Sequence, residues 1–168
     1  MQSEKALSMK KILFLLLSAL MVALVAGAQA PGAAVVKWRT SVRMTSPTEG
    51  VVTLRAIIPE GAHLYGMTMP EGGPKATTLD FGASQGVKFT GRTSASPAPT
   101  VARDEAFGMD LQWWEGRVAF SQSFRLTAKD AAEARINVKV TYMTCNGMNC
   151  MPPRTESISA PVPPFKKK

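Results

Sequence analysis

Much of this chain alternates between apolar and polar residues with a period of two, which is typical of β-strands that bury one face. In the stretch from 134 to 144, every second residue is apolar: Ile136, Val138, Val140 and Tyr142. Residues 117–126 alternate in the same way. The same pattern, or a run of β-branched residues, predicts further strands at 35–43, 50–58, 61–69, 77–81, 87–90, 111–114 and 155–162.

Clusters of Gly, Pro, Asn and Ser separate these segments, as expected for turns between short strands. The segment Ser94 to Thr100, SASPAPT, is predicted to be a loop because strands continue on both sides of it. The only helical pattern after the N-terminal region lies at 127–134 and is long enough for a turn or two. Strands of this length and spacing predict a single all-β sandwich.

The N-terminal region has a different pattern, which is that of a secretory signal peptide. Lys10 and Lys11 precede an apolar run at 12–25, and small residues follow it. The run is shorter than the roughly 20 residues that span a membrane, so no stable membrane insertion is expected. We predict a signal peptide at residues 1–28, cut after Ala28 or alternatively after Ala30.

The charge of the chain changes the predicted domain organisation little. The chain has 20 Lys and Arg against 12 Asp and Glu, a net charge of +8, and the basic residues are scattered. The one basic run ends the chain after a Pro-rich stretch, so residues 164–168 are interpreted as a solvated tail. Basic and aromatic residues are not interleaved, and no nucleic-acid partner is predicted. The folded domain is expected to occupy residues 31–163.

Candidate chemistry centres on two cysteines, Cys145 and Cys150. An exported chain meets an oxidising compartment, where a disulfide is the expected state of such a pair. Asn146 and Gly147 readily take the positive φ angles of a tight turn, so the chain is predicted to fold back and join the two sulfurs.

The residues alone leave the purpose of this bond open. The loop is short, so the chain-entropy model gives the bond only ~2 kcal/mol of stabilisation. Pro152 and Pro153 remove two backbone donors, which favours an edge position for the pair that a partner protein could reach. The bond could therefore be exchange-active, or it could be the structural disulfide of a non-catalytic envelope binding module.

Metal binding is a further alternative. Methionines flank the cysteines or could approach them, and thiolate and thioether ligands suit Cu(I), although methionine also fills gaps in ordinary cores. They are Met67, Met69, Met109, Met143, Met148 and Met151. Two Cys and the single histidine, His63, fall short of the four ligands of a zinc site. No metal site is therefore predicted, and His63 alone is interpreted as a packed residue.

Three segments resemble the N-terminal periplasmic domain of the thiol:disulfide interchange protein DsbD. Residues 142–153, YMTCNGMNCMPP, are similar to its redox segment, with an aromatic residue, two cysteines and a Pro-Pro. Residues 61–65, GAHLY, are similar to the strand that places rings beside the cysteines. Residues 104–108, DEAFG, resemble the acidic and aromatic cap loop. The three segments lie in the family's order and span most of the predicted domain.

The resemblance implies an immunoglobulin-like sandwich that works in the periplasm as a thiol:disulfide oxidoreductase of the redox-carrier type. Electrons would come from a membrane reductant and pass to periplasmic thioredoxin-fold proteins, with no cofactor beyond the two sulfurs. Cys150 would form the mixed disulfide with partners, and Cys145 would resolve it. DsbD itself continues into membrane helices and a thioredoxin-like domain that this sequence lacks, so the reductant is expected to be a separate protein.

The resemblance also assigns roles around the sulfurs. Asp104 and Glu105 would disfavour a thiolate, Phe107 would be the lid, and His63 and Tyr65 would pack beside the disulfide. One residue departs from the family's pattern: Ala106 stands directly after the acidic pair, where the family often has its cap aromatic. Phe107 is therefore expected to cover the disulfide in a different way.

Overall fold

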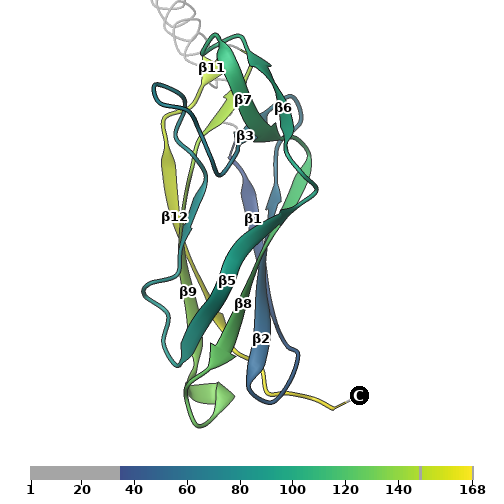
Figure 1. Ribbon diagram of the computed structural model, residues 1–168, viewed down its shortest axis with the longest axis vertical. Coiled ribbons are helices and arrows are strands. Elements are labelled where there is room, and N and C mark those ends of the chain that lie inside the picture. Colours follow the sequence, from purple (N-terminus) through teal and green to yellow (C-terminus); the bar gives the residue numbers. More distant parts are fainter. Residues whose placement is uncertain (1–34, 148, 168) are drawn as a thin grey trace, which may run out of the picture. The chain divides into compact units, whose positions relative to one another are not determined.

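The computed structural model describes residues 35–147 and 149–167, and nearly all regular structure in this part is β-strand (Figure 1). The strands are β1 Lys37–Met44, β2 Glu49–Ile57, β3 His63–Tyr65, β4 Thr78–Asp80, β5 Val87–Ser96, β6 Thr100–Asp104, β7 Met109–Trp114, β8 Arg117–Leu126, β9 Arg135–Tyr142, β10 Thr144–Asn146, β11 Asn149–Cys150 and β12 Arg154–Pro161. The predicted signal peptide, residues 1–28, lies outside the described residues.

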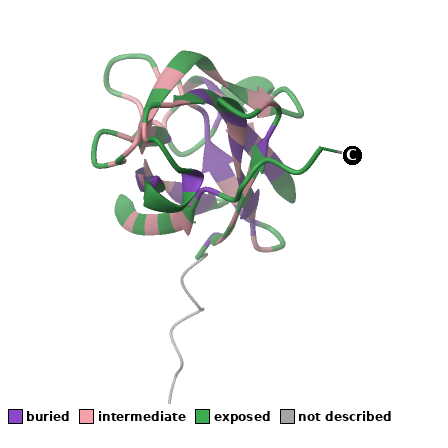
Figure 2. Cartoon of the chain, turned by 90° about the horizontal axis from the view of Figure 1, so that it is seen from below, coloured by how far each residue is buried: buried purple, intermediate pink, exposed green. Residues whose placement is uncertain are grey.

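Two sheets enclose the main core. One has the order β1-β2-β8-β5 and the other β12-β9-β4, and all their pairings are antiparallel. The alternation in the sequence matches what each strand buries. The four apolar residues at even positions of β9 are almost fully buried, as are Val52, Leu54 and Ala56 of β2 and Val118, Phe120 and Phe124 of β8. Figure 2 shows buried, purple stretches of strand mostly towards the middle of the domain and exposed, green stretches mostly towards its outside. The predicted all-β, immunoglobulin-like sandwich is confirmed.

A third sheet lies at the end of the domain where β6 and β7 are labelled in Figure 1, and it has the order β11-β10-β3-β7-β6. The chain enters it directly from the main core, because only Met143 separates β9 from β10. This sheet carries both cysteines. It also carries a second apolar cluster, distinct from the main core, that includes Cys145.

One local prediction needs correction. The segment from Ser94 to Thr100 is mostly strand, since β5 runs to Ser96 and β6 begins at Thr100. A register shift between Thr90 and Ser94 lets β5 continue along β8 past the point where its regular alternation stops. The expected short helix at 127–134 is one 3-10 turn, Ala131–Glu133, capped by the side chain of Asp130.

Among the described residues, no helix is long and apolar enough to cross a membrane.

Candidate functional site

The two cysteines lie near the tip of a long hairpin. Strands β9 and β12 pair continuously from Arg135 opposite Pro161 to Tyr142 opposite Arg154, and beyond them Cys145 stands opposite Cys150. Between these two pairs, the three residues 151–153 face the two residues 143–144, so the second strand carries one extra residue. Such bulges redirect a strand and are frequent beside active sites. Beyond this irregularity, the tip strands β10 and β11 belong to the third sheet.

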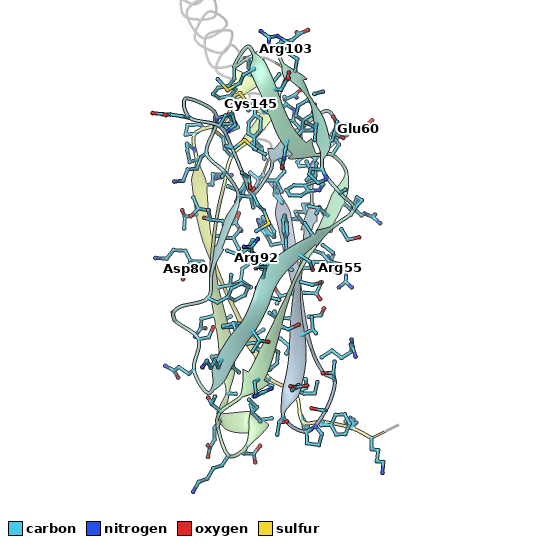
Figure 3. All side chains as sticks on the ribbon, in the orientation of Figure 1. Arg55, Glu60, Asp80, Arg92, Arg103 and Cys145 are labelled. Atoms are coloured by element: carbon cyan, nitrogen blue, oxygen red, sulfur yellow. A yellow bond between two sulfur atoms is a disulfide. The ribbon has the colours of Figure 1, made fainter. Side chains whose placement is uncertain are left out.

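Cys145 and Cys150 form a disulfide, with their Cα atoms 4.0 Å apart. Cys145 is fully buried, whereas Cys150 is half-buried on β11, the edge strand of its sheet. Gly147 takes a positive φ of 56°, but Asn146 does not, so the expectation of two positive φ angles was wrong for Asn146. Figure 3 shows Cys145 at the same end of the domain as Arg103, the residue before Asp104.

Tyr65 is the group that touches both sulfurs. It is fully buried on β3, which lies between β10 and β7. Its hydroxyl lies 3.0 Å from Cys145 Sγ, 3.8 Å from Cys150 Sγ and 2.8 Å from Asp104 Oδ2. Burial, followed by the hydrogen bond and charge of Asp104, raises the pKa of Tyr65 well above its ordinary value. The phenol therefore keeps its proton and acts as a donor.

Asp104 joins the disulfide to the turn at 105–108. It ends β6 and is only 5% exposed. Its Oδ1 accepts the backbone N–H of Phe107 at 3.0 Å, its backbone carbonyl accepts the N–H of Gly108 at 2.8 Å, and its Oδ2 accepts the Tyr65 hydroxyl. The Asp104 carboxylate therefore holds the turn through Oδ1 and the Tyr65 hydroxyl through Oδ2.

Phe107 projects from this turn onto the site. Its half-buried ring packs edge-on against Tyr65, with the ring centroids 5.8 Å apart. It belongs to the apolar cluster around the disulfide, which comprises Tyr65, Met69, Phe107, Met109, Leu111, Trp113, Met143, Cys145 and Cys150. The turn leaves Glu105 and Ala106 exposed.

His63 lies on the same strand as Tyr65 and opposite Cys145 in the β3–β10 pairing. Its ring centroid is 4.9 Å from that of Tyr65 and 5.2 Å from that of Trp113. Its Nε2 is 3.5 Å from Asp104 Oδ2, yet this buried nitrogen makes no hydrogen bond within the described residues. Burial lowers the pKa of His63, and the negative charges of Asp104 and Glu115 oppose that shift.

The methionines divide between two places. Met69, Met109 and Met143 pack in the cluster around the disulfide, whereas Met67 packs against the main core. Met148 lies outside the described residues. Among those that are described, no three His, Cys, Asp or Glu side chains come together as a metal-binding group.

Sequence reasoning missed Trp113. Its strand position opposite Tyr65 brings its indole against His63, so it forms one wall of the site. The adjacent tryptophans at 113 and 114 were the available signal, since two such side chains on a strand point to opposite faces. Trp114 is buried in the main core, which leaves Trp113 for the site.

The fold and site thus combine a β-sandwich with a disulfide at a sheet edge, whose inner cysteine is buried against Tyr65, and this arrangement suits thiol–disulfide exchange. A family model described as "Thiol:disulfide interchange protein DsbD, N-terminal" matches residues 33–161. The chain therefore belongs to the family of DsbD N-terminal domains, which confirms the resemblance drawn from the three segments. Membership and the Cys145–Cys150 bond together indicate a general role in thiol–disulfide interchange.

One solved structure shows a similar fold. The N-terminal periplasmic domain of ScsB from Proteus mirabilis is similar with a TM-score of 0.57 and 18% identity, over 80% of this chain and 49% of that one. The chain thus spans about half the length of that structure. The reduced DsbD N-terminal domain of Neisseria meningitidis gives a TM-score of 0.49 and 14% identity, over 74% of this chain and 84% of that one. A search of curated proteins finds no match to the sequence.

Proposed function

We propose that this protein is a periplasmic redox carrier that passes electrons through Cys145 and Cys150 to thioredoxin-fold proteins. One observation carries the proposal: Cys150 lies on the edge strand β11 and is partly exposed, whereas its partner Cys145 is fully buried. A bond that served stability alone would contribute little here, since closing so short a loop is worth only ~2 kcal/mol.

Reduction of the pair begins when a donor thiolate attacks Cys150 Sγ. The Cys145–Cys150 bond breaks, a mixed disulfide forms at Cys150, and the electron pair leaves on Cys145 Sγ. The donor's second thiol then releases Cys150. In the forward transfer, the Cys150 thiolate attacks the disulfide of an acceptor, and Cys145 resolves the mixed disulfide. The acceptor leaves as a dithiol, and the carrier is oxidised again.

The surroundings of the sulfurs favour selective rather than fast exchange. The Asp104 carboxylate shares the Tyr65 hydroxyl with Cys145, so it disfavours a thiolate there by like-charge repulsion. Glu105, exposed on the same turn, adds negative charge at the entrance. Phe107, whose ring packs against Tyr65 in the cluster around the disulfide, would act as a lid that a partner must displace before reaching Cys150.

Partners and location follow from the family and from the predicted signal peptide. The acceptors would be periplasmic thioredoxin-fold proteins, and the donor would be a separate membrane reductant. Cleavage of residues 1–28 would release the domain into the periplasm. The disulfide expected in that compartment is the one that the structure contains.

The test is to trap a partner in cells. Cys145→Ala removes the resolving thiol, so a mixed disulfide at Cys150 should accumulate and run as a larger species in non-reducing electrophoresis of envelope extracts. Cys150→Ala is the matched control, and it should trap far less because Cys145 is buried. Both variants should remain folded, since the bond contributes ~2 kcal/mol against a usual total of 5–15 kcal/mol.

Absence of trapped partners with Cys145→Ala, together with loss of the fold in both variants, would mean that the bond is structural. The protein would then be better described as an envelope binding module.

A further inference from the structure

Basic residues that are scattered along the sequence come together on the outer face of the β1-β2-β8-β5 sheet. Residues at odd positions of β1, β2 and β8 point outward, because their neighbours at even positions are turned to the main core. The register of the sheet places Lys88 of β5 on the same face, opposite Arg125 of β8. Among the described residues of this face, seven are basic and exposed: Lys37, Arg39, Arg43, Arg55, Lys88, Arg117 and Arg125.

Acidic residues on the same face do not balance this charge. The outward positions of the four strands include one carboxylate in the described structure, that of Glu49, and it pairs with Arg125 at 3.1 Å. No carboxylate pairs with the other six basic residues within the described part of the chain. These six side chains therefore face solvent without a counter-charge from the protein.

The register of the strands concentrates part of this charge at one level of the sheet. Arg39 on β1 stands directly opposite Arg55 on β2, and Arg117 on β8 lies diagonally across from Arg55. Like charges directly opposite each other on neighbouring strands destabilise a sheet. All three arginines line one open hollow of about 570 Å³, beside Ser96 on β5. A negatively charged surface that approached this hollow would relieve the repulsion.

The opposite sheet, β12-β9-β4, differs in charge. The described basic residues on its outer face are Arg135 and Lys139, and Asp80 on β4 stands directly opposite Lys139. The excess of positive charge therefore belongs to one face of the sandwich and is not spread evenly over the protein.

The residues between the basic side chains indicate what kind of partner fits this face. The row across the middle of the sheet consists of small polar residues, Ser41, Thr53, Ser121 and Ser94. No aromatic side chain points outward from the described strands of this sheet, whereas protein interfaces usually centre on buried aromatic anchors. Positive charge that extends from one end of β1 and β8 to the other instead matches a continuous negative surface, such as the headgroups of an anionic membrane.

We propose that the outer face of the β1-β2-β8-β5 sheet docks on the anionic headgroups of a phospholipid membrane. The strands of this sheet run towards the end of the domain that carries the disulfide, so a domain lying on this face keeps the tip beside the membrane (Figure 1). A membrane reductant would meet the disulfide there. The docking goes beyond the proposed function, because it depends on the charge of the sheet and not on exchange at the sulfurs.

The test is sedimentation of the mature protein, purified from the cell envelope, with vesicles of phosphatidylglycerol and phosphatidylcholine. Binding should rise with the phosphatidylglycerol content and be absent on phosphatidylcholine alone. It should be lost in ~1 M salt, where the Debye length falls to about 3 Å. Arg39→Gln combined with Arg55→Gln should weaken binding about 25-fold, since each basic residue near an anionic surface contributes roughly fivefold, or ~1 kcal/mol.

Arg135→Gln combined with Lys139→Gln is the matched control, because it removes the same two charges from the opposite sheet. It should bind nearly as well as the unmodified protein, and the basic tail at 164–168 is kept in all variants. Unfolding in urea checks that both double variants are folded, and the loss of the Arg39–Arg55 pair should not lower stability.

Two results would overturn the proposal. Equal weakening by the two double variants would mean that net charge, rather than this face, drives binding. Absence of binding to phosphatidylglycerol vesicles at low salt would exclude a membrane and leave an acidic protein as the partner of the face. The measurement involves no thiol partner, so failed trapping with Cys145→Ala would leave its outcome independent.

Discussion

The lid role proposed for Phe107 gives the sharpest prediction. In Phe107→Ala the turn should persist, because Asp104 holds it through the backbone N–H groups of residues 107 and 108, which remain. Only the aromatic ring is lost. If the ring shields the sulfurs, a small thiol should reach Cys150 more often in the variant.

The expected increase in the rate of reduction follows from what the Phe107 ring contacts. Full burial of a phenylalanine is worth ~1.5–3 kcal/mol, so a half-buried ring contributes about 1 kcal/mol. The edge-on pair with Tyr65 adds ~0.5–1.5 kcal/mol. Lid opening should therefore be easier by about 2 kcal/mol, which corresponds to a roughly 30-fold faster reduction.

The assay is the rate of reduction by dithiothreitol, followed by mass after alkylation of the released thiols. Phe81→Ala is the matched control, since Phe81 is also half-buried and packs on an aromatic ring, that of Phe89 at 4.6 Å, but in the main core. Both variants should lose similar stability in urea, and only Phe107→Ala should be reduced faster. An unchanged rate, or an equal increase in both variants, would show that Phe107 is not a lid.

Two further predictions concern the hairpin tip and export. Gly147→Ala places a side chain at a φ of 56°, which costs an L-residue ~1–2 kcal/mol. The free energy of unfolding measured in urea should fall by about that amount, and an unchanged value would contradict the turn geometry. The mature protein in the cell envelope should begin between Gln29 and Pro31 by mass spectrometry, and an intact N-terminus in the cytoplasm would contradict the predicted signal peptide.

Strands that bury one face against the main core were the easiest to predict. Strand β8 has the predicted bounds, Arg117–Leu126, and the alternation of β9 matches its buried positions. Strand β6 was not predicted because its residues before Asp104 are all exposed. Strand β6 is positioned by its pairing with β7, and the pattern of apolar and polar residues within β6 does not predict that pairing.

The site was predicted by family resemblance rather than by local pattern. The Tyr65 hydroxyl meets a carboxylate 39 residues away and a sulfur 80 residues away, and no periodicity encodes such contacts. The hairpin tip around the two cysteines was only partly predicted from the sequence. The fold-back at Gly147 was expected, but the extra residue at 151–153 was not. The roles given to the two cysteines in exchange, to Asp104 and Glu105 in disfavouring a thiolate, and to Phe107 as a lid remain predictions.

The long hairpin has a consequence for the reduced protein. Eight paired positions of β9 and β12 continue into the two stems of the tip, so the two thiols remain neighbours after their bond is broken. Each thiol then sees the other at a high effective concentration, because the folded stems have already removed most of the freedom that separates them. Once Cys150 is joined to an acceptor in a mixed disulfide, attack by Cys145 should outpace attack by dilute external thiols, so the Cys145–Cys150 bond re-forms and the acceptor leaves as a dithiol.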